Sequence, residues 1–366
     1  MRDLSIEISD KDLTNGAAQG SLSTAHPALA PIEFLPKWLL CVPLVTQWMW
    51  LGLRYRTPTL PSVLNPDIKT GGLAGESKMS YLAPIDPRLR AWVADTFAVK
   101  PREDPVAIRR RNNLAFPLVA KPDIGWCGYG VRRIDSEEEL AAYGREFPSD
   151  AVFLLQRFAH EKNEAGILYV REARAASGRV SALTVRHAPC VVGDGRHSVA
   201  DLIADDLRTQ RNAARYALSA EALARVPEAG ERVLLTTVAS VRVGGRYEDL
   251  TRFVTPALDA AVDAIARSIG DFHYGRFDVK FESLADLQAG RFTIIEINGA
   301  GSEAIQFLDP RLSLKAAFAG VFAKQRALFA LAHEMRKLGH KPVTWHELAA
   351  AWIRQQRLIR HYPKSN

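Results

Sequence analysis

The sequence predicts a protein of the α+β class, because strand-like and helix-like patterns follow one another along most of its 366 residues. β-Branched content with alternating polarity is typical of strands, and apolar residues every three or four positions are typical of helices. Six runs are expected to be strands: 114–121, 151–158, 167–174, 180–187, 273–281 and 291–298. Helices are expected after Ser136, from Thr255 to about Ile269, and over 312–336 and 345–360.

Three of these helix starts carry capping residues. Ser136 with Glu139 and Thr344 with Glu347 have the spacing of a capping box. The Thr-Pro pair at 255–256 places Pro at the first helical position after an N-cap residue. These positions therefore predict where the helices begin.

Composition limits the kinds of protein that this chain can be. With 47% hydrophobic and 24% charged residues, it is neither disordered nor repetitive. The net charge of +7 is compatible with a solvated surface, with anionic ligands such as nucleotides, or with an anionic membrane surface. No recognised nucleic-acid motif accompanies the charge, so no nucleic-acid partner is expected.

The cysteines and the N-terminus bear on the compartment. Cys41, Cys127 and Cys190 are odd in number and share no metal-ligand spacing. This argues against a disulfide framework and favours a reducing cytoplasm. Residues 1–30 are expected to be a mobile polar tail, and their acidic residues do not suit a signal peptide.

An apolar stretch, WLLCVPLVTQWMWLGL, runs from Trp38 to Leu53 without a formal charge and has basic residues on both sides. It is shorter than the roughly 20 residues that span a bilayer, and Pro43 interrupts it. Three interpretations stay open. Residues 34–56 are a helix on the cytoplasmic face of a membrane, a helix of the protein core, or a membrane span.

The last two predicted strands carry polar side chains on matching faces. Side chains alternate between the faces of a strand, so Arg276, Asp278 and Lys280 share one face of the first. Glu296 and Asn298 share one face of the second. Two carboxylates and an amide oxygen on neighbouring strands form an oxygen site suited to Mg²⁺. The alternative is a structural salt bridge between these acids and the basic residues beside them.

A glycine-rich loop follows the first predicted strand. Lys121 and Pro122 precede Gly125, Gly128 and Gly130 in KPDIGWCGYGV. Glycines let a backbone approach a polyphosphate closely, and a lysine adds a point charge for phosphate. An ordinary turn is the alternative, because the loop matches neither a Walker loop nor a dinucleotide fingerprint.

The order of the motifs carries a family resemblance. KPDIGWCGYGV, LLQRF, RFD and EIN follow one another, and Glu164 stands eight residues after Gln156. This set resembles the ATP-grasp superfamily over roughly residues 70–305. Within it, CVVGDGRHSVADLI (190–203), VPEAGERVLL (226–235) and GGRYEDLT (244–251) are similar to the ligase domain of cyanophycin synthetase and its relatives. D-Alanine–D-alanine ligase is similar more distantly.

The resemblance implies an ATP-grasp fold, in which two α+β lobes enclose the nucleotide, here with an N-terminal extension and a helical C-terminal tail. Together with the composition, it gives the expected division of the chain: a mobile tail (1–30), a Trp-rich apolar and interfacial or buried segment (31–60), an N-terminal region (61–113), the ATP-grasp domain (114–310) and C-terminal helices (311–366).

The resemblance also implies the residues that bind ATP. They are Lys78, Lys121, Gly125, Gly128, Gly130, Gln156, Arg157, Phe158 and Glu164. Residues 156–158 match the hinge whose backbone reads adenine, and Glu164 matches the acid that holds the ribose hydroxyls. The family usually has Glu where Gln156 stands. Lys78 matches the second phosphate-binding lysine, with plain surface charge as the alternative.

The remaining matched residues concern metal and chemistry. Asp278, Glu296 and Asn298 match the ligands of Mg²⁺ or Mn²⁺, and Arg276 matches the arginine that stabilises the transferring phosphoryl group. Arg186 ends a strand and either binds the acyl phosphate or a substrate carboxylate, or caps a surface turn.

The implied activity is that of an ATP- and Mg-dependent carboxylate–amine ligase working through an acyl phosphate, with Arg276 and Lys121 neutralising the developing charge. A phosphotransferase and a non-catalytic nucleotide-binding regulator are the alternatives. The partners implied are a small carboxylate and an amine, one of them lipid-linked if residues 34–56 contact a membrane, and a homodimer is compatible with the sequence. Residues 299–303 replace the family's usual Asn-Pro-Gly turn, which leaves the substrate class open.

Overall fold

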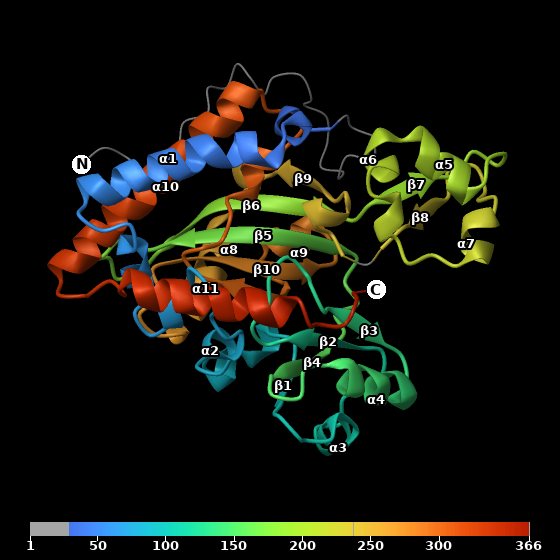
Figure 1. Cartoon of the computed structure of the whole chain (residues 1–366), viewed down its shortest axis with the longest axis horizontal. Coiled ribbons are helices and arrows are strands. Elements are labelled where there is room, and N and C mark those ends of the chain that lie inside the picture. Colours follow the sequence, from blue (N-terminus) through green and yellow to red (C-terminus); the bar gives the residue numbers. More distant parts are fainter. Residues whose placement is uncertain (1–28, 237, 366) are drawn as a thin grey trace.

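A computed structural model describes residues 29–236 and 238–365 of the chain. Their strands form two antiparallel sheets and one further pair of short strands, with helices packed around them (Figure 1). The α+β class predicted from the sequence is therefore confirmed. Residues 1–28 of the predicted mobile tail lie outside the described residues.

The larger sheet has the strand order β11-β10-β5-β6-β9, with all neighbours antiparallel. Its strands are β5 (Asn163–Val170), β6 (Arg179–His187), β9 (Arg246–Asp249), β10 (Tyr274–Phe281) and β11 (Thr293–Asn298). β5 begins four residues before the predicted run at 167. Its first residues have little strand propensity, but they pair with the end of β10, and this pairing outweighs local preference.

One face of the larger sheet forms the main core. Phe277, Val279 and Phe281 of β10 are buried there with α8 (Pro256–Ser268). The side chain of Thr255 caps this helix, as predicted. Because strand side chains alternate, the even-numbered residues of β10 lie on the opposite face.

The opposite face is covered by α10 (Leu314–Lys337) and the short 3-10 helix η3 (Leu60–Leu64). α1 (Lys37–Arg54) lies along α10 as an outer layer (Figure 1). Leu51 at its inner side is buried in this second core. None of the helices in the described part of the chain has the length and apolar character needed to cross a bilayer.

The smaller sheet has the order β1-β4-β2-β3 and is also antiparallel. Its elements are β1 (Thr96–Val99), β2 (Leu118–Pro122), β3 (Arg132–Ile134), β4 (Phe153–Arg157), α3 (Pro105–Arg111) and α4 (Glu137–Glu146). β1, β3 and α3 were not predicted, because elements this short show no periodicity.

The predicted capping box before α4 is only half formed. The hydroxyl of Ser136 accepts from the amide of Glu139 at 3.2 Å, as expected. The carboxylate of Glu139 instead accepts from the amide of Asp135, one residue before the cap.

A small outlying unit extends to one side of the molecule (Figure 1). It contains β7 (Cys190–Val192), β8 (Arg232–Leu234), α5 (Val199–Asp205), α6 (Leu207–Gln210) and α7 (Ala220–Ala224). Its own core is small and centres on Val191, Val199, Ile203 and Leu235.

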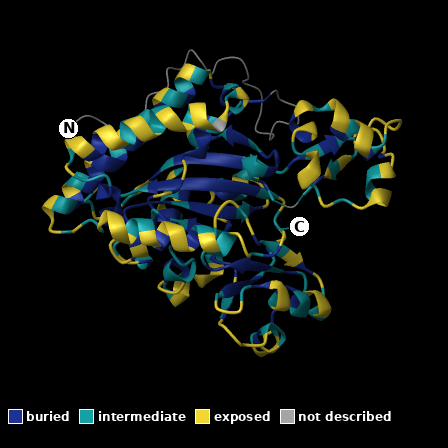
Figure 2. Cartoon of the chain, in the orientation of Figure 1, coloured by how far each residue is buried: buried dark blue, intermediate teal, exposed yellow. Residues whose placement is uncertain are grey.

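The chain ends with α11 (Trp345–Ile359), whose predicted capping box between Thr344 and Glu347 is complete. α11 crosses from the larger sheet toward β2 and β3, and the C-terminus lies beside the smaller sheet (Figure 1). The strands of the larger sheet are mostly buried, whereas α1 and α11 present exposed outer faces (Figure 2).

Candidate active site

The strand pair β10–β11 brings the predicted metal-binding side chains together. Arg276 stands opposite Asn298 and Asp278 opposite Glu296 in the antiparallel register. Directly opposed residues have side chains on the same face within about 4.5–5.5 Å at Cβ. The two carboxylates and the amide therefore share one small region, on the face of the sheet away from α8.

Asp278 lies at the centre of a buried ion-pair network. Its carboxylate accepts from Arg276 Nε at 2.7 Å and pairs with Arg186 Nη1 at 3.0 Å. Arg186 also pairs with Glu164 at 2.9 Å, and Glu164 pairs with Lys280 at 3.2 Å. Three neighbouring strands, β6, β5 and β10, thus contribute alternating charges to one face.

The pKa values in this network follow from burial and pairing. Burial alone would raise the pKa of Asp278, but Arg276 and Arg186 more than offset it and hold that pKa below its usual value. Burial alone would lower the pKa of Arg186, but Glu164 and Asp278 raise it. Both groups are therefore charged at neutral pH.

Glu296 is more exposed and has fewer ion-pair partners than Asp278. Its side chain is 32% exposed, and it pairs with Lys78 Nζ at 3.3 Å. Burial raises the pKa of the neighbouring Glu76, and the charge of Glu296 contributes to that rise. Glu76 Oε2 is buried without a hydrogen-bond partner among the described residues.

These residues fit a magnesium ion by their chemistry. Carboxylate and amide oxygens are the donors that Mg²⁺ prefers, and an additional cation would relieve the repulsion between Glu76 and Glu296. In the described part of the chain, no three His, Cys, Asp or Glu side chains converge as a preformed metal cluster. The residues that would supply the oxygen donors for magnesium are Asp278, Glu296 and Asn298, and both carboxylate oxygens of Asp278 already pair with arginines.

Lys121 connects the smaller sheet to this region. Its side chain leaves β2 and donates to Ile295 O of β11 at 2.7 Å and to Gln156 Oε1 at 2.9 Å. Among the described residues it has no carboxylate within ion-pair distance, and its residue is only 6% exposed. Burial is the main cause that lowers the pKa of Lys121 to about 8. A buried cation held only by neutral oxygens is suited to an incoming anion.

The predicted hinge residues lie at the end of β4 in the smaller sheet, with Phe158 just after it, but the side chain of Gln156 has a structural role of its own. Its side chain is buried and bonds Lys121 and Thr96, so its amide oxygen is already occupied. The amide of Arg157 donates to Asp95 O at 2.8 Å. Phe158 packs beside Arg133, whose guanidinium lies 5.2 Å from the ring centre.

The glycine-rich loop follows Lys121 directly. Gly128 and Gly130 have φ values of 74° and 73°, which a residue with a side chain rarely adopts. Lys78 Nζ lies 2.8 Å from the position that a Cβ would take on Gly125. The structure therefore places Lys78, the loop and Glu296 against one another.

Two charged residues of this region were not among the predicted site residues. Glu76 stands two positions before Lys78, and that spacing in GGLAGESK was the only available signal. Lys324 reaches the site from α10 and donates to Ser302 O at 2.7 Å. Burial lowers its pKa to about 8. Nothing in the helical pattern of α10 distinguishes Lys324 from a solvated lysine.

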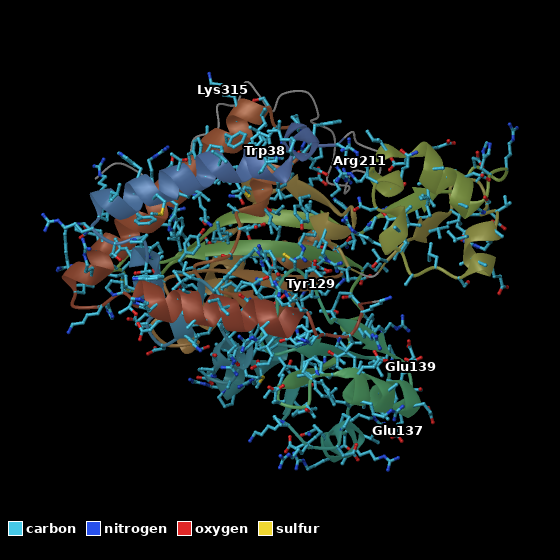
Figure 3. All side chains as sticks on the ribbon, in the orientation of Figure 1. Trp38, Tyr129, Glu137, Glu139, Arg211 and Lys315 are labelled. Carbon is cyan, nitrogen blue, oxygen red and sulfur yellow. The ribbon has the colours of Figure 1, made fainter. Side chains whose placement is uncertain are left out.

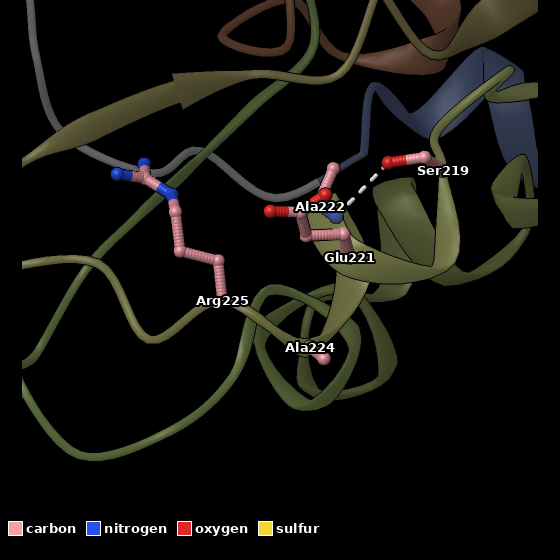
Figure 4. Close-up of a pocket in the computed structure, with 5 residues that line it drawn as sticks. All are labelled: Ser219, Glu221, Ala222, Ala224 and Arg225. Atoms are coloured by element: carbon pink, nitrogen blue, oxygen red, sulfur yellow. Dashed lines mark hydrogen bonds between the residues drawn. The ribbon is translucent and has the colours of Figure 1, made fainter.

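A shallow surface pocket lies elsewhere, in the outlying unit (Figure 4). It is lined by Ser219, Glu221, Ala222, Ala224 and Arg225. The hydrogen bond inside it, from the Ala222 amide to Ser219 Oγ at 3.1 Å, is the N-cap of α7. This pocket contains no part of the charged network.

No family model matches the sequence, and no curated protein matches it. Among solved structures, the chain is similar to a bifunctional glutathione synthetase from Pasteurella multocida, with 16% identity, a TM-score of 0.35, and coverage of 69% of this chain and 38% of that one. D-Alanine–D-alanine ligase from Bacillus anthracis has 13% identity and a TM-score of 0.41, and the match covers 73% of this chain and 70% of that one.

VanG D-Ala:D-Ser ligase from Enterococcus faecalis has 14% identity, a TM-score of 0.36, and coverage of 74% of this chain and 63% of that one. The chain thus spans little more than a third of the glutathione synthetase. All three TM-scores are below 0.5.

Proposed function

We propose that this protein is an ATP- and magnesium-dependent carboxylate–amine ligase of the ATP-grasp type. The observation that carries the proposal is the meeting of two lysines, a glycine-rich loop and two opposed carboxylates where the smaller sheet touches the larger one. Lys121 makes that contact directly through Ile295 O. Cations, free loop amides and acids in one place suit a nucleotide triphosphate with its metal.

In this proposal the phosphates bind between Lys121, Lys78 and the loop. Lys121 has no carboxylate partner among the described residues, so it can pair with a phosphate. Lys78 forms an ion pair with Glu296. The adenine binds at the hinge, residues 156–158, through backbone groups, because the side chain of Gln156 is engaged elsewhere.

Glu164 needs a different account from the one that the resemblance implies. It pairs with both Arg186 and Lys280. A contact with the ribose hydroxyls would have to share its carboxylate with those two cations. We therefore propose that its first function is to orient Arg186.

Magnesium, when bound, would neutralise phosphate charge and orient the transferring group. The residues that would hold it are Asp278, Glu296 and Asn298. Arg276 and Arg186 are both fixed on Asp278, so their remaining N–H groups are oriented before substrate arrives. Such pre-oriented donors stabilise developing charge without having to reorganise.

The proposed reaction has two steps. A substrate carboxylate oxygen attacks the γ-phosphorus, the bond to the β–γ bridging oxygen breaks, and ADP leaves. An amine nitrogen then attacks the acyl carbon, the bond to the phosphate oxygen breaks, and inorganic phosphate and a proton leave with the amide formed. Arg276 and Lys121 hold the transferring group, and the site excludes water that would hydrolyse the acyl phosphate.

Product analysis tests this proposal. A ligase yields ADP and free phosphate without AMP, and one labelled carboxylate oxygen passes into the phosphate. Hydroxylamine should trap a hydroxamate when the acid and ATP are present without the amine. A phosphotransferase would keep phosphate on its product, and a regulator would release almost none. Either outcome rejects the ligase.

We also propose that the enzyme works at an anionic membrane surface, which it contacts through α1. Seven apolar side chains of this helix are exposed: Trp38, Leu39, Val42, Val45, Met49, Trp50 and Leu53. α1 contains no acidic residue, and Arg54 at its end lies 5.5 Å over the Trp50 ring. Lys315 of α10 and Trp38 lie at the same end of the helix pair (Figure 3). Exposed tryptophans with basic neighbours suit lipid headgroups.

Trp48 provides a matched control for this proposal. Its indole points inward, donates to Pro58 O at 3.0 Å and packs on Phe329 at 4.9 Å. Trp38→Ser with Trp50→Ser should abolish binding to vesicles that contain phosphatidylserine without lowering the melting temperature. Trp48→Ser should lower the melting temperature instead. Equal vesicle binding by the double variant, or a dimer dissociated by it, would reject the membrane proposal.

A further inference from the structure

Three side chains near the C-terminus hold backbone carbonyls of the glycine-rich loop. The donor-to-acceptor contacts are Tyr362 Oη to Ile124 O at 2.6 Å, Gln355 Nε2 to Gly125 O at 2.9 Å, and Ser365 Oγ to Gly128 O at 2.8 Å. The partners are at least 230 residues apart in the sequence. A loop next to the proposed phosphate site is thus shaped by the end of the chain.

These contacts also determine where the amides of the loop point. A trans peptide is planar, so its C=O and N–H point in opposite directions. Holding the carbonyls of Ile124 and Gly125 toward the tail turns the amides of Gly125 and Trp126 the other way. Neither amide donates a hydrogen bond to another described residue. They are available to an anion.

The tail itself is firmly seated on the smaller sheet. The ring of Tyr362 stacks on Phe147 with centroids 5.1 Å apart and planes 13° from parallel. A Cβ on Gly130 would lie 2.8 Å from Pro122 Cγ and 3.1 Å from Tyr362 Cβ, so a larger residue at this position would push against both. Arg132 Nε donates to Lys364 O at 2.5 Å. Burial also raises the pKa of the Tyr362 phenol, which keeps it a donor.

The preceding helix contacts the other phosphate-binding segment. A Cβ on Gly75 would lie 2.9 Å from Ala351 O of α11, and Gly75 is three residues before Lys78. α11 and the tail therefore contact both the segment of Lys78 and the glycine-rich loop. No other element in the described part of the chain donates side-chain hydrogen bonds to more than one carbonyl of residues 123–131.

We infer that the C-terminal segment from Gln355 to Ser365 is part of the nucleotide site, and that Tyr362 is a positioning residue that holds the loop amides for phosphate oxygens. The inference rests on the proposed function, since it assigns the loop to ATP. It adds that phosphate affinity depends on residues that touch no substrate. A tail that only stabilises the fold would affect phosphates and adenosine alike.

Full-length Tyr362→Phe tests this inference, because it removes one hydroxyl and keeps the ring on Phe147. We expect the Kd for Mg-ATP in calorimetric titration to rise about three- to tenfold, the worth of one hydrogen bond. The Kd for adenosine should stay unchanged, since adenosine has no phosphate. Ser365→Ala, a milder change, should shift the Mg-ATP affinity in the same direction if Tyr362→Phe proves poorly folded.

Tyr169→Phe is the matched control. It removes a buried hydroxyl that bonds Asp263 at 2.7 Å on the α8 face of the larger sheet. It should lower the melting temperature and leave both affinities unchanged. If Tyr362→Phe leaves Mg-ATP affinity unchanged, or weakens adenosine equally, the inference is wrong and the proposed function stands. If the wild-type protein binds no Mg-ATP, both are wrong.

Discussion

Two groups of basic side chains lie on the polar face of β10, and they differ in the partners that bind their charges. Around Asp278, the guanidinium groups of Arg276 and Arg186 each find a carboxylate within about 3 Å. Around Lys324, at the side of α10, the ammonium donates to a backbone carbonyl instead. The hydroxyls of Tyr274 and Ser302 nearby are buried without partners in the described structure.

This difference indicates that the two regions have different tasks: one holds its side chains in position, and the other is suited to bind a ligand. A closed network of ion pairs keeps its members in place without any ligand, so the Asp278 region has one fixed arrangement before any substrate binds. A buried ammonium and two unpaired hydroxyls carry an energetic cost that a bound group with oxygen acceptors would offset. The Lys324 side is therefore where a substrate is expected to complete the structure.

The largest expected effect concerns the closed network. Asp278→Asn should lower turnover by about a hundred- to a thousandfold, since it removes a proposed metal donor and the anchor of two arginines. It should also destabilise the protein by about 3–5 kcal/mol, because two buried guanidinium groups lose their carboxylate. Chemical denaturation and ATP turnover measure the two effects.

Glu296→Gln sharpens this result. Glu296 is partly exposed and has one ion pair, so the same loss of turnover should come with little change in stability. Near-normal turnover of Glu296→Gln at saturating Mg²⁺ would remove Glu296 from the metal site.

A smaller effect is expected at Lys121, which joins the two sheets. Lys121→Met should raise the Kd for Mg-ATP by about ten- to a hundredfold, because a buried charge–phosphate contact is lost. An unchanged Kd for adenosine would show that the fold is kept. A variant that binds Mg-ATP as the wild type does would place the phosphates elsewhere.

At Lys324 we expect the opposite effect on stability from that at Asp278: removal of the charge should stabilise the folded protein. Its pKa, about 8, is below the unfolded value near 10.5, so the folded state disfavours the ammonium. Stability should therefore rise as the pH increases from about 8 to about 10.5, and be lowest below 8. Lys324→Met should stabilise the protein at pH 7 by about 1 kcal/mol, with partial exposure taken into account, and reduce this pH dependence to the part that Lys121, whose pKa is also about 8, contributes. A destabilised variant would instead make Lys324 an ordinary structural contact.

The last expected effect appears only at alkaline pH, in the pH dependence of ATP binding. Free Lys121 has a pKa of about 8, and bound phosphate would raise it, so binding takes up a proton between the two values. The Kd for Mg-ATP should be constant below pH 8 and then rise by up to about tenfold per pH unit. Lys121→Arg should remove this slope, because arginine stays charged. The same slope in both proteins would assign it to another group.

The sequence by itself determined the features that depend on local pattern. Strand parity placed Arg276 and Asp278 on one face and Glu296 on the matching face, and the register seen in the structure, with Asp278 opposite Glu296, agrees with it. The capping box at Thr344 and the cap at Thr255 mark helix starts as expected, because a cap needs only residues three or four apart.

Only the tertiary structure decided what depends on contacts between distant segments. The sequence did not distinguish Trp48, which packs in the core, from Trp38 and Trp50, which face outward. Apolar residues occupy all sides of this helix, so the side that is buried depends on which elements pack against it. Nor did it show that Tyr362 holds Ile124. Such pairs are determined by the packing of whole elements, since no local rule relates residues more than 200 positions apart.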